Sequence, residues 1–134
     1  MAYMNRIGTS RNPFQGDAKK VLCVCSAGLL RSPTAANVLH KEYGYNTRAC
    51  GVTTNFALIP LEAVLLHWAD EIVFVEQEVY DMAWDDYKDI LKDKEKIVLA
   101  IPDIYYWGDP ELEAIIKKQY DDAVIMEKVL VQDK

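Results

Sequence analysis

Strand-like and helix-like segments alternate four times along this chain of 134 residues. Residues 21–24, 72–75 and 96–101 are short apolar runs rich in β-branched side chains, which is typical of buried strands. The more mixed segment 45–52 is predicted as the remaining strand. Strands that each precede a helix predict a parallel sheet with helices on both faces. Ligands of such sheets bind beyond the carboxyl ends of the strands, so we expect a functional site at that rim.

The helices are predicted from start and stop signals as well as from apolar spacing. Gly44 is expected to end the first of them, and Asp109 followed by proline is typical of an N-cap and first helical position. Pro60 is expected to begin the second helix. The predicted helices are residues 33 to about 43, a segment from Pro60 to Trp68, one or two helices within 76–94, and 110 to about 130.

The first strand leads into a loop that carries two reactive side chains. Cys25 opens this loop and Arg31 closes it, with five residues between them. Ser32 is expected to be the N-cap of the following helix, with Pro33 at its first position. A strand–loop–helix turn directs backbone N–H groups and the positive end of a helix dipole at one point. The segment therefore predicts an anion-binding site.

The two side chains add chemistry to that site. A helix N-terminus and a neighbouring guanidinium both stabilise a thiolate, so Cys25 is a candidate nucleophile. Arg31 can present two parallel N–H groups to the oxygens of a phosphate-like anion. The alternative is a buried core cysteine beside a surface charge.

Cys-x5-Arg-Ser-Pro after an apolar strand resembles the loop of the low-molecular-weight protein tyrosine phosphatases. The resemblance implies a flavodoxin-like, three-layer α/β fold with strand order 2-1-3-4. It also implies a phosphomonoester hydrolase that forms a phosphocysteine on Cys25, without a metal or other cofactor, and acts on phosphotyrosine proteins or small aryl phosphates. It assigns phosphate binding to one run of residues: Ser26, Ala27, Gly28, Leu29, Leu30, Arg31 and Ser32.

A second segment resembles the part of the family that supplies the general acid. Pro102-Asp103 follows the fourth predicted strand, on the rim where Cys25 is expected, and the family carries an Asp-Pro-Tyr-like segment late in its chain. By this match Asp103 protonates the leaving oxygen and later activates water. Asp109 is a rival for this role, although aspartate before proline at a helix start is mostly a cap. Tyr105 and Tyr106 are predicted to line the substrate pocket.

Three residues depart from the family pattern. Leu29 stands where the family has an asparagine that braces the loop, Leu30 replaces a protective cysteine, and Ile104 replaces a proline. These departures leave two other functions open. One is a module that binds phosphate or phosphotyrosine with little turnover, and the other is thiol-dependent arsenate reduction with Cys50 as the second thiol.

Composition limits the partners and the cellular setting. The net charge of −6 argues against nucleic acid and acidic membranes as partners. Three cysteines without regular spacing favour reduced thiols in a cytoplasm. The first residues show no signal-peptide pattern, and no histidine pair or calcium-loop spacing predicts a metal site. We expect residues 1–19 to be an irregular extension and residues 20–134 to be a single domain of unknown oligomeric state.

Overall fold

The sheet of this protein is parallel and has the strand order β2-β1-β3-β4. Our computed structural model describes residues 18–26, 31–53, 59–102, 104–105 and 109–132, with side chains as far as residue 125. The strands are β1 (Lys20–Cys25), β2 (Asn46–Gly51), β3 (Glu71–Phe74) and β4 (Glu95–Val98). The predicted fold class and strand order 2-1-3-4 are confirmed.

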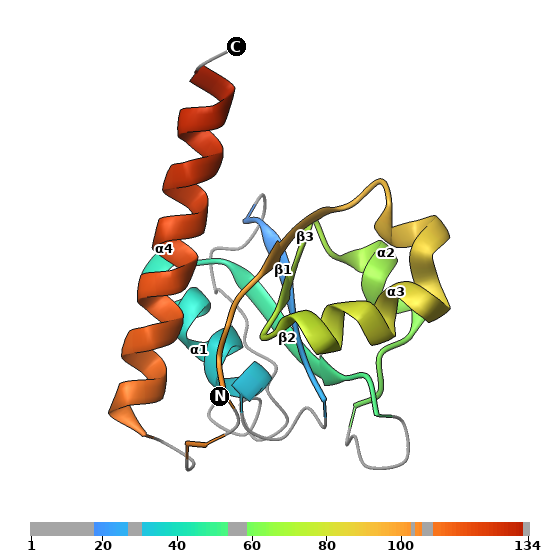
Figure 1. The fold of residues 1–134 in the computed structure, drawn as a ribbon, viewed down its shortest axis with the longest axis horizontal. Helices are drawn as coiled ribbons and strands as arrows, with labels where there is room; N and C mark the ends of the chain where they lie inside the picture. The colour runs from blue at the N-terminus through green and yellow to red at the C-terminus, as the bar shows by residue number, and fades with distance from the viewer. Residues whose placement is uncertain (1–17, 27–30, 54–58, 103, 106–108, 133–134) are drawn as a thin grey trace.

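Four helices cover the two faces of the sheet. They are α1 (Arg31–Tyr43), α2 (Ala63–Trp68), α3 (Gln77–Leu91) and α4 (Pro110–Gln132). Helix α1 packs with α4, and α2 packs with α3, so the sheet lies between two helical layers (Figure 1). The far end of α4 extends beyond the sheet in this view. Within the described part of the chain, no helix is long and apolar enough to cross a membrane.

The central position of β1 and β3 explains why the apolar runs 21–24 and 72–75 contain no polar residue. Strand β1 pairs with β2 on one side and with β3 on the other, and Val21–Val24 of β1 is fully buried. Strand β3 is buried along its whole length. A parallel strand covered by helices on both faces has no solvent face, so neither face selects for polar residues.

Two helix ends agree with the predicted signals. Gly44 has a φ of 71°, and its N–H donates to the carbonyl of His40 at 2.9 Å, which closes α1. The Asp109 carboxylate accepts the N–H of Glu111 at 2.9 Å, so Asp109 is the cap of α4. Capping of α4 explains the aspartate at position 109, so no catalytic role is needed to explain it.

Three predicted boundaries are wrong. Helix α1 begins at Arg31, so Ser32 lies within its first turn and is not the N-cap. Pro60 forms a bridge with Gly51, and α2 begins only at Ala63. Strand β4 ends at Val98, earlier than expected. The preference of proline for the first position of a helix does not decide the structure at Pro60. The bridge to Gly51 instead makes Pro60 part of an extension of the sheet beside β2.

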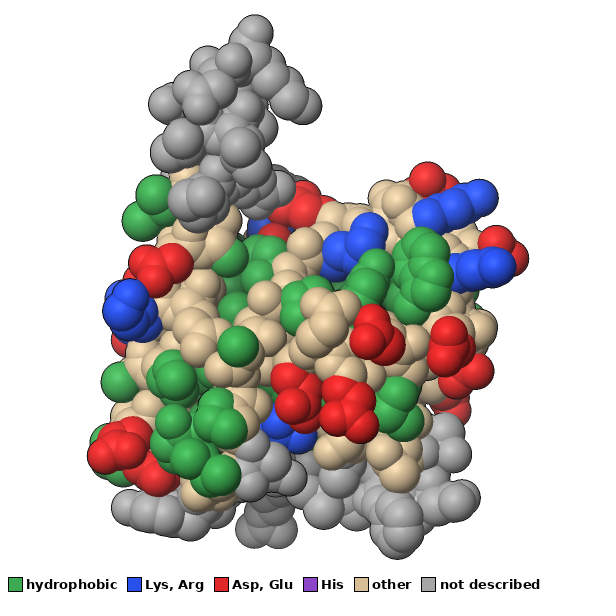
Figure 2. Space-filling view, in the orientation of Figure 1, with side chains coloured by type: hydrophobic (Ala, Val, Ile, Leu, Met, Phe, Trp, Pro, Cys, Tyr) green, Lys and Arg blue, Asp and Glu red, His purple; other side chains and the backbone are tan. Residues whose placement is uncertain are grey.

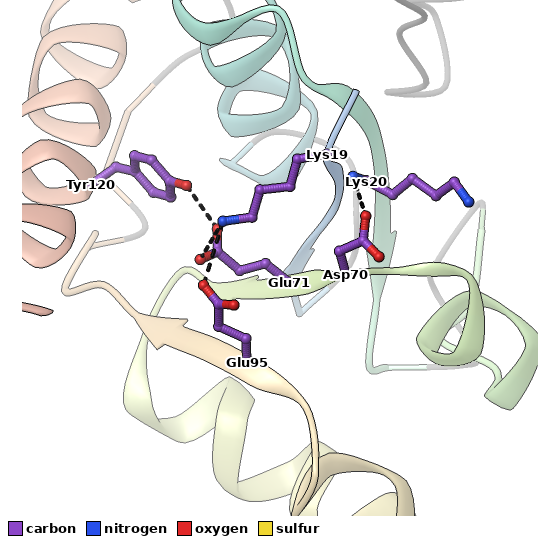
Figure 3. Close-up of polar contacts among 6 residues, drawn as sticks. All are labelled: Lys19, Lys20, Asp70, Glu71, Glu95 and Tyr120. Atoms are coloured by element: carbon purple, nitrogen blue, oxygen red, sulfur yellow. Dashed lines mark hydrogen bonds and ion pairs between the residues drawn. The ribbon is translucent and has the colours of Figure 1, made fainter. Parts of the chain in front are cut away.

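A cluster of charged residues around one buried carboxylate lies at the amino ends of the strands, opposite the rim of the predicted site. Glu71 is fully buried; its carboxylate accepts the Tyr120 hydroxyl at 2.7 Å and Lys19 Nζ at 3.2 Å (Figure 3). Lys19 also reaches Glu95 at 3.4 Å. Burial raises the pKa of Glu71, although the contacts with Tyr120 and Lys19 oppose this shift. The cluster joins the start of β1 to β3, β4 and α4.

Candidate active site

Cys25 is the last residue of β1 and lies against the first turn of α1. Its Sγ is 3.1 Å from the hydroxyl oxygen of Ser32, and its exposed fraction is 3%. The chain turns back from β1 into α1, and this turn brings together two residues seven positions apart. The cysteine is therefore buried, as in the alternative interpretation, but its sulfur has a polar partner at the carboxyl rim of the sheet.

Ser32 connects that sulfur to the neighbouring strand. Its Oγ lies 3.2 Å from the carbonyl oxygen of Cys50, to which it can donate. A hydroxyl has one hydrogen, so it serves either this carbonyl or the sulfur of Cys25. A protonated thiol can donate to Ser32, whereas a thiolate can only accept. Ionisation of Cys25 therefore favours a Ser32 hydroxyl that turns away from Cys50 and donates to the sulfur.

Arg31 is held at the same rim by the segments that follow β3 and β4. Its Nη1 donates to Glu76 Oε1 at 2.8 Å and to the carbonyl oxygen of Ile101 at 2.9 Å. Glu76 follows β3 and Ile101 follows β4 in sequence. The side chain is only 4% exposed, so the alternative of a surface charge is wrong for Arg31. Contacts from the segments after two different strands thus fix the guanidinium at the carboxyl rim of the sheet.

Much of the predicted phosphate loop lies outside the described residues. This applies to Ala27, Gly28, Leu29 and Leu30, and also to Asp103 and Tyr106, whose assigned roles remain predictions. Ser26 is described, and its carbonyl accepts the N–H of Thr53 at 2.8 Å. This bond joins the start of the loop to the segment after β2.

Tyr105 is half-buried and packs against the core, whereas Ile104 beside it is 77% exposed. This packing gives Tyr105 a structural role. Its role in the substrate pocket stays a prediction.

Glu76 is the residue that sequence reasoning missed. It is a carboxylate immediately beyond a fully buried strand, on the rim where the site was expected, and that position was the available signal. Its ion pair with Arg31 spans 45 positions in the sequence and depends on strand order. No motif pointed to the carbonyl of Ile101, because any residue type supplies a backbone oxygen.

The other two cysteines are buried in the sheet. Cys23 and Cys50 are both fully buried, and burial raises the pKa of each thiol. A protonated, inaccessible thiol is a poor partner for disulfide exchange. The position of Cys50 therefore disfavours arsenate reduction. Among the described residues, no group of three potential ligands could hold a metal ion.

Two solved structures share this fold at low sequence identity. The YwlE arginine phosphatase from Geobacillus stearothermophilus is 17% identical, with a TM-score of 0.58 over 83% of this chain and 96% of its own. The tyrosine phosphatase Wzb from Escherichia coli K30, solved with phosphate, is 13% identical, with a TM-score of 0.62 over 78% and 95%. No family model and no curated protein matches the sequence. The chain therefore has the fold of these phosphatases.

Proposed function

We propose that this protein is a cysteine-dependent phosphomonoester hydrolase of the low-molecular-weight type. The observation that carries the proposal is the 3.1 Å contact between the Cys25 sulfur and the Ser32 hydroxyl at the carboxyl rim of the sheet, where Glu76 also holds the guanidinium of Arg31, the residue before Ser32. A nucleophile beside an oriented guanidinium is what covalent phosphoryl transfer needs. The two phosphatases with the same fold support it.

The proposed reaction has two displacements at phosphorus. The Cys25 thiolate attacks phosphorus, an S–P bond forms, and the bond to the leaving oxygen breaks as Asp103 protonates that oxygen. Asp103 then removes a proton from water, which attacks the phosphocysteine and releases phosphate and the thiolate. Arg31 and the loop amides bind the equatorial oxygens throughout. Ser32 stabilises the sulfur anion by donating its hydroxyl hydrogen.

The proposed substrate is a phosphotyrosine protein, with Tyr105 and Tyr106 beside the phenyl ring. One of the two structural neighbours is named an arginine phosphatase, so phosphoarginine is the second candidate. We propose that the enzyme works in the cytoplasm, because its cysteines are free thiols. A peptide carrying either phosphorylated residue in the same flanking sequence separates these substrates by kcat/KM.

Hydrolysis of p-nitrophenyl phosphate tests the reaction class. We expect turnover that EDTA leaves unchanged and vanadate blocks, because the nucleophile is a thiolate and vanadate resembles the five-coordinate phosphorus. Tight binding of a phosphotyrosine peptide without phosphate release would instead identify a binding module. Thiol-dependent arsenate turnover that requires Cys50 would identify a reductase.

Replacing Asp103 by asparagine tests the general acid. We expect kcat for p-nitrophenyl phosphate to fall by a factor of about 100, in the range of general acid–base catalysis, with little change in the Kd of inorganic phosphate. Asp109→Asn is the matched control, since Asp109 caps α4 and should affect thermal stability more than kcat. A wild-type rate in Asp103→Asn would remove Asp103 from this role.

A further inference from the structure

Strand β4 is an edge strand, and part of its outer side makes no hydrogen bond with the other residues that the structure describes. The sheet ends at β4, and the N–H groups of Leu99 and Ile101 point inward to the carbonyls of Phe74 and Val75 at 2.8 and 2.9 Å. Backbone groups of an extended chain alternate in direction, so those of Val98 point away from β3. Such an edge is a template for another extended chain.

The outward backbone groups of Ala100, just after β4, are already paired with a side-chain amide. This pairing shows how the edge can bind the amide groups of another chain. The side chain of Gln119 on α4 accepts the N–H of Ala100 at 2.7 Å and donates to its carbonyl at 3.0 Å. These two bonds are those that the backbone of a neighbouring strand would make. Gln119 thus closes the edge at Ala100, while Val98 before it is 37% exposed.

A groove of about 670 Å³ follows this edge towards the candidate active site. Its described lining residues come from β4 and the segment after it, from the start of α3 and from α4: Glu76, Gln77, Val98, Leu99, Ala100, Ile101, Pro102, Gln119 and Asp122. Glu76 also holds Arg31 at 2.8 Å, so one end of the groove adjoins the anion site. Figure 1 shows this edge between α3 and α4 on the near face.

The acidic charge of the groove favours extended chains that carry basic side chains. Among its described lining residues, the charged ones are Glu76 and Asp122. Figure 2 shows acidic side chains gathered on this face near the start of α3. Asp122 pairs with Lys118 at 2.9 Å, but both side chains are more than half exposed, so a cation on a partner can replace Lys118 at little cost.

We propose that the edge of β4 and this groove bind an extended, basic segment of the protein substrate. The segment adds to the sheet beside Val98 through backbone hydrogen bonds, and a Lys or Arg side chain replaces Lys118 at Asp122. Because Gln119 occupies the outward groups of Ala100, the segment leaves the edge there, and four extended residues span about 13 Å, enough to continue along the groove towards the rim. The identification of this segment as part of a substrate rests on the proposed phosphatase function. The existence of the docking surface does not depend on that function.

An unphosphorylated peptide tests the docking surface separately from catalysis. The probe is a ten-residue peptide in which Val or Thr alternates with Arg, titrated into the full-length 15N-labelled protein. We expect amide shifts at Val98 and its neighbours, binding weakened at least about tenfold when alternate peptide amides are N-methylated, and little binding by the same peptide with Glu in place of Arg. N-methylation alters only the peptide, so the protein fold is unaffected.

Asp122→Asn and Asp121→Asn form a matched pair of variants. Each aspartate lies on α4 and pairs with a lysine one turn earlier at 2.9 Å, but only Asp122 is among the groove residues. We expect Asp122→Asn to weaken peptide binding about fivefold and Asp121→Asn to leave it unchanged, with hydrolysis of p-nitrophenyl phosphate the same in both.

Two results would overturn the proposal. One is binding that ignores both N-methylation and Asp122→Asn. The other is a full-length protein that binds no peptide, whether a second copy or its own first residues cover the edge. Loss of p-nitrophenyl phosphate hydrolysis is a different outcome, since it would reject the phosphatase function and leave the peptide titration unaffected.

Discussion

Replacing Cys25 by serine is expected to lower kcat for p-nitrophenyl phosphate by about 10⁴-fold or more, in the range seen when an enzyme loses its covalent nucleophile. A serine hydroxyl is far less acidic than a thiol, so at neutral pH it supplies almost none of the anionic nucleophile that the thiol provides. Steady-state hydrolysis and a search for a phosphoenzyme by mass spectrometry after rapid acid quench provide the measurement.

The matched control is Cys50→Ala. Ser32 contacts the backbone carbonyl of Cys50 and not its thiol, so this contact survives the substitution. We expect Cys50→Ala to keep at least about a tenth of the wild-type kcat, with the loss due to a small cavity in the core. Cys25→Ser should still bind inorganic phosphate, because Arg31 and the loop remain. Undiminished turnover by Cys25→Ser would exclude the phosphocysteine route.

Replacing Arg31 by alanine is expected to lower kcat/KM by about 10³-fold and to weaken phosphate binding. The change removes the donor that faces the developing charge, and loss of a single such donor typically lowers rates by about 10² to 10³. It also leaves Glu76 and the carbonyl of Ile101 without their bonds to Nη1, so the free energy of unfolding should fall by about 1–3 kcal/mol. Hydrolysis kinetics, phosphate titration and thermal melting measure the three effects.

Two further variants separate charge from geometry. Arg31→Lys retains a positive charge but not the planar fork, so we expect an intermediate rate. Arg48→Ala is the control for losing an arginine, because Arg48 lies on β2 with its guanidinium over the ring of Trp68 at 4.4 Å. If Arg31→Ala behaved like Arg48→Ala, the guanidinium would have no part in catalysis.

The sequence predicted those features that depend on local patterns. The order of elements followed from buried runs such as 72–75, and the cap at Asp109 followed from its proline neighbour. Features that depend on tertiary pairing were not predictable in this way. The ion pair between Arg31 and Glu76 needs the strand order, and the Gln119 contact with Ala100 needs the docking of α4 against the end of β4. No local preference encodes either contact.

The Lys19 contact sets a limit on how far the amino end can be shortened. A protein that begins at Lys20 would keep all of β1 and yet lose the only cation that contacts Glu71 among the described residues. Since Lys19 lowers the pKa of Glu71, its loss would raise that pKa further. A carboxyl with a raised folded-state pKa loses its stabilising contribution as pH rises through that value. Between the unfolded-state and folded-state pKa values of Glu71, the stability of such a trimmed protein would therefore fall more with rising pH than that of the full chain, because of a carboxyl at the end of the strands opposite Cys25.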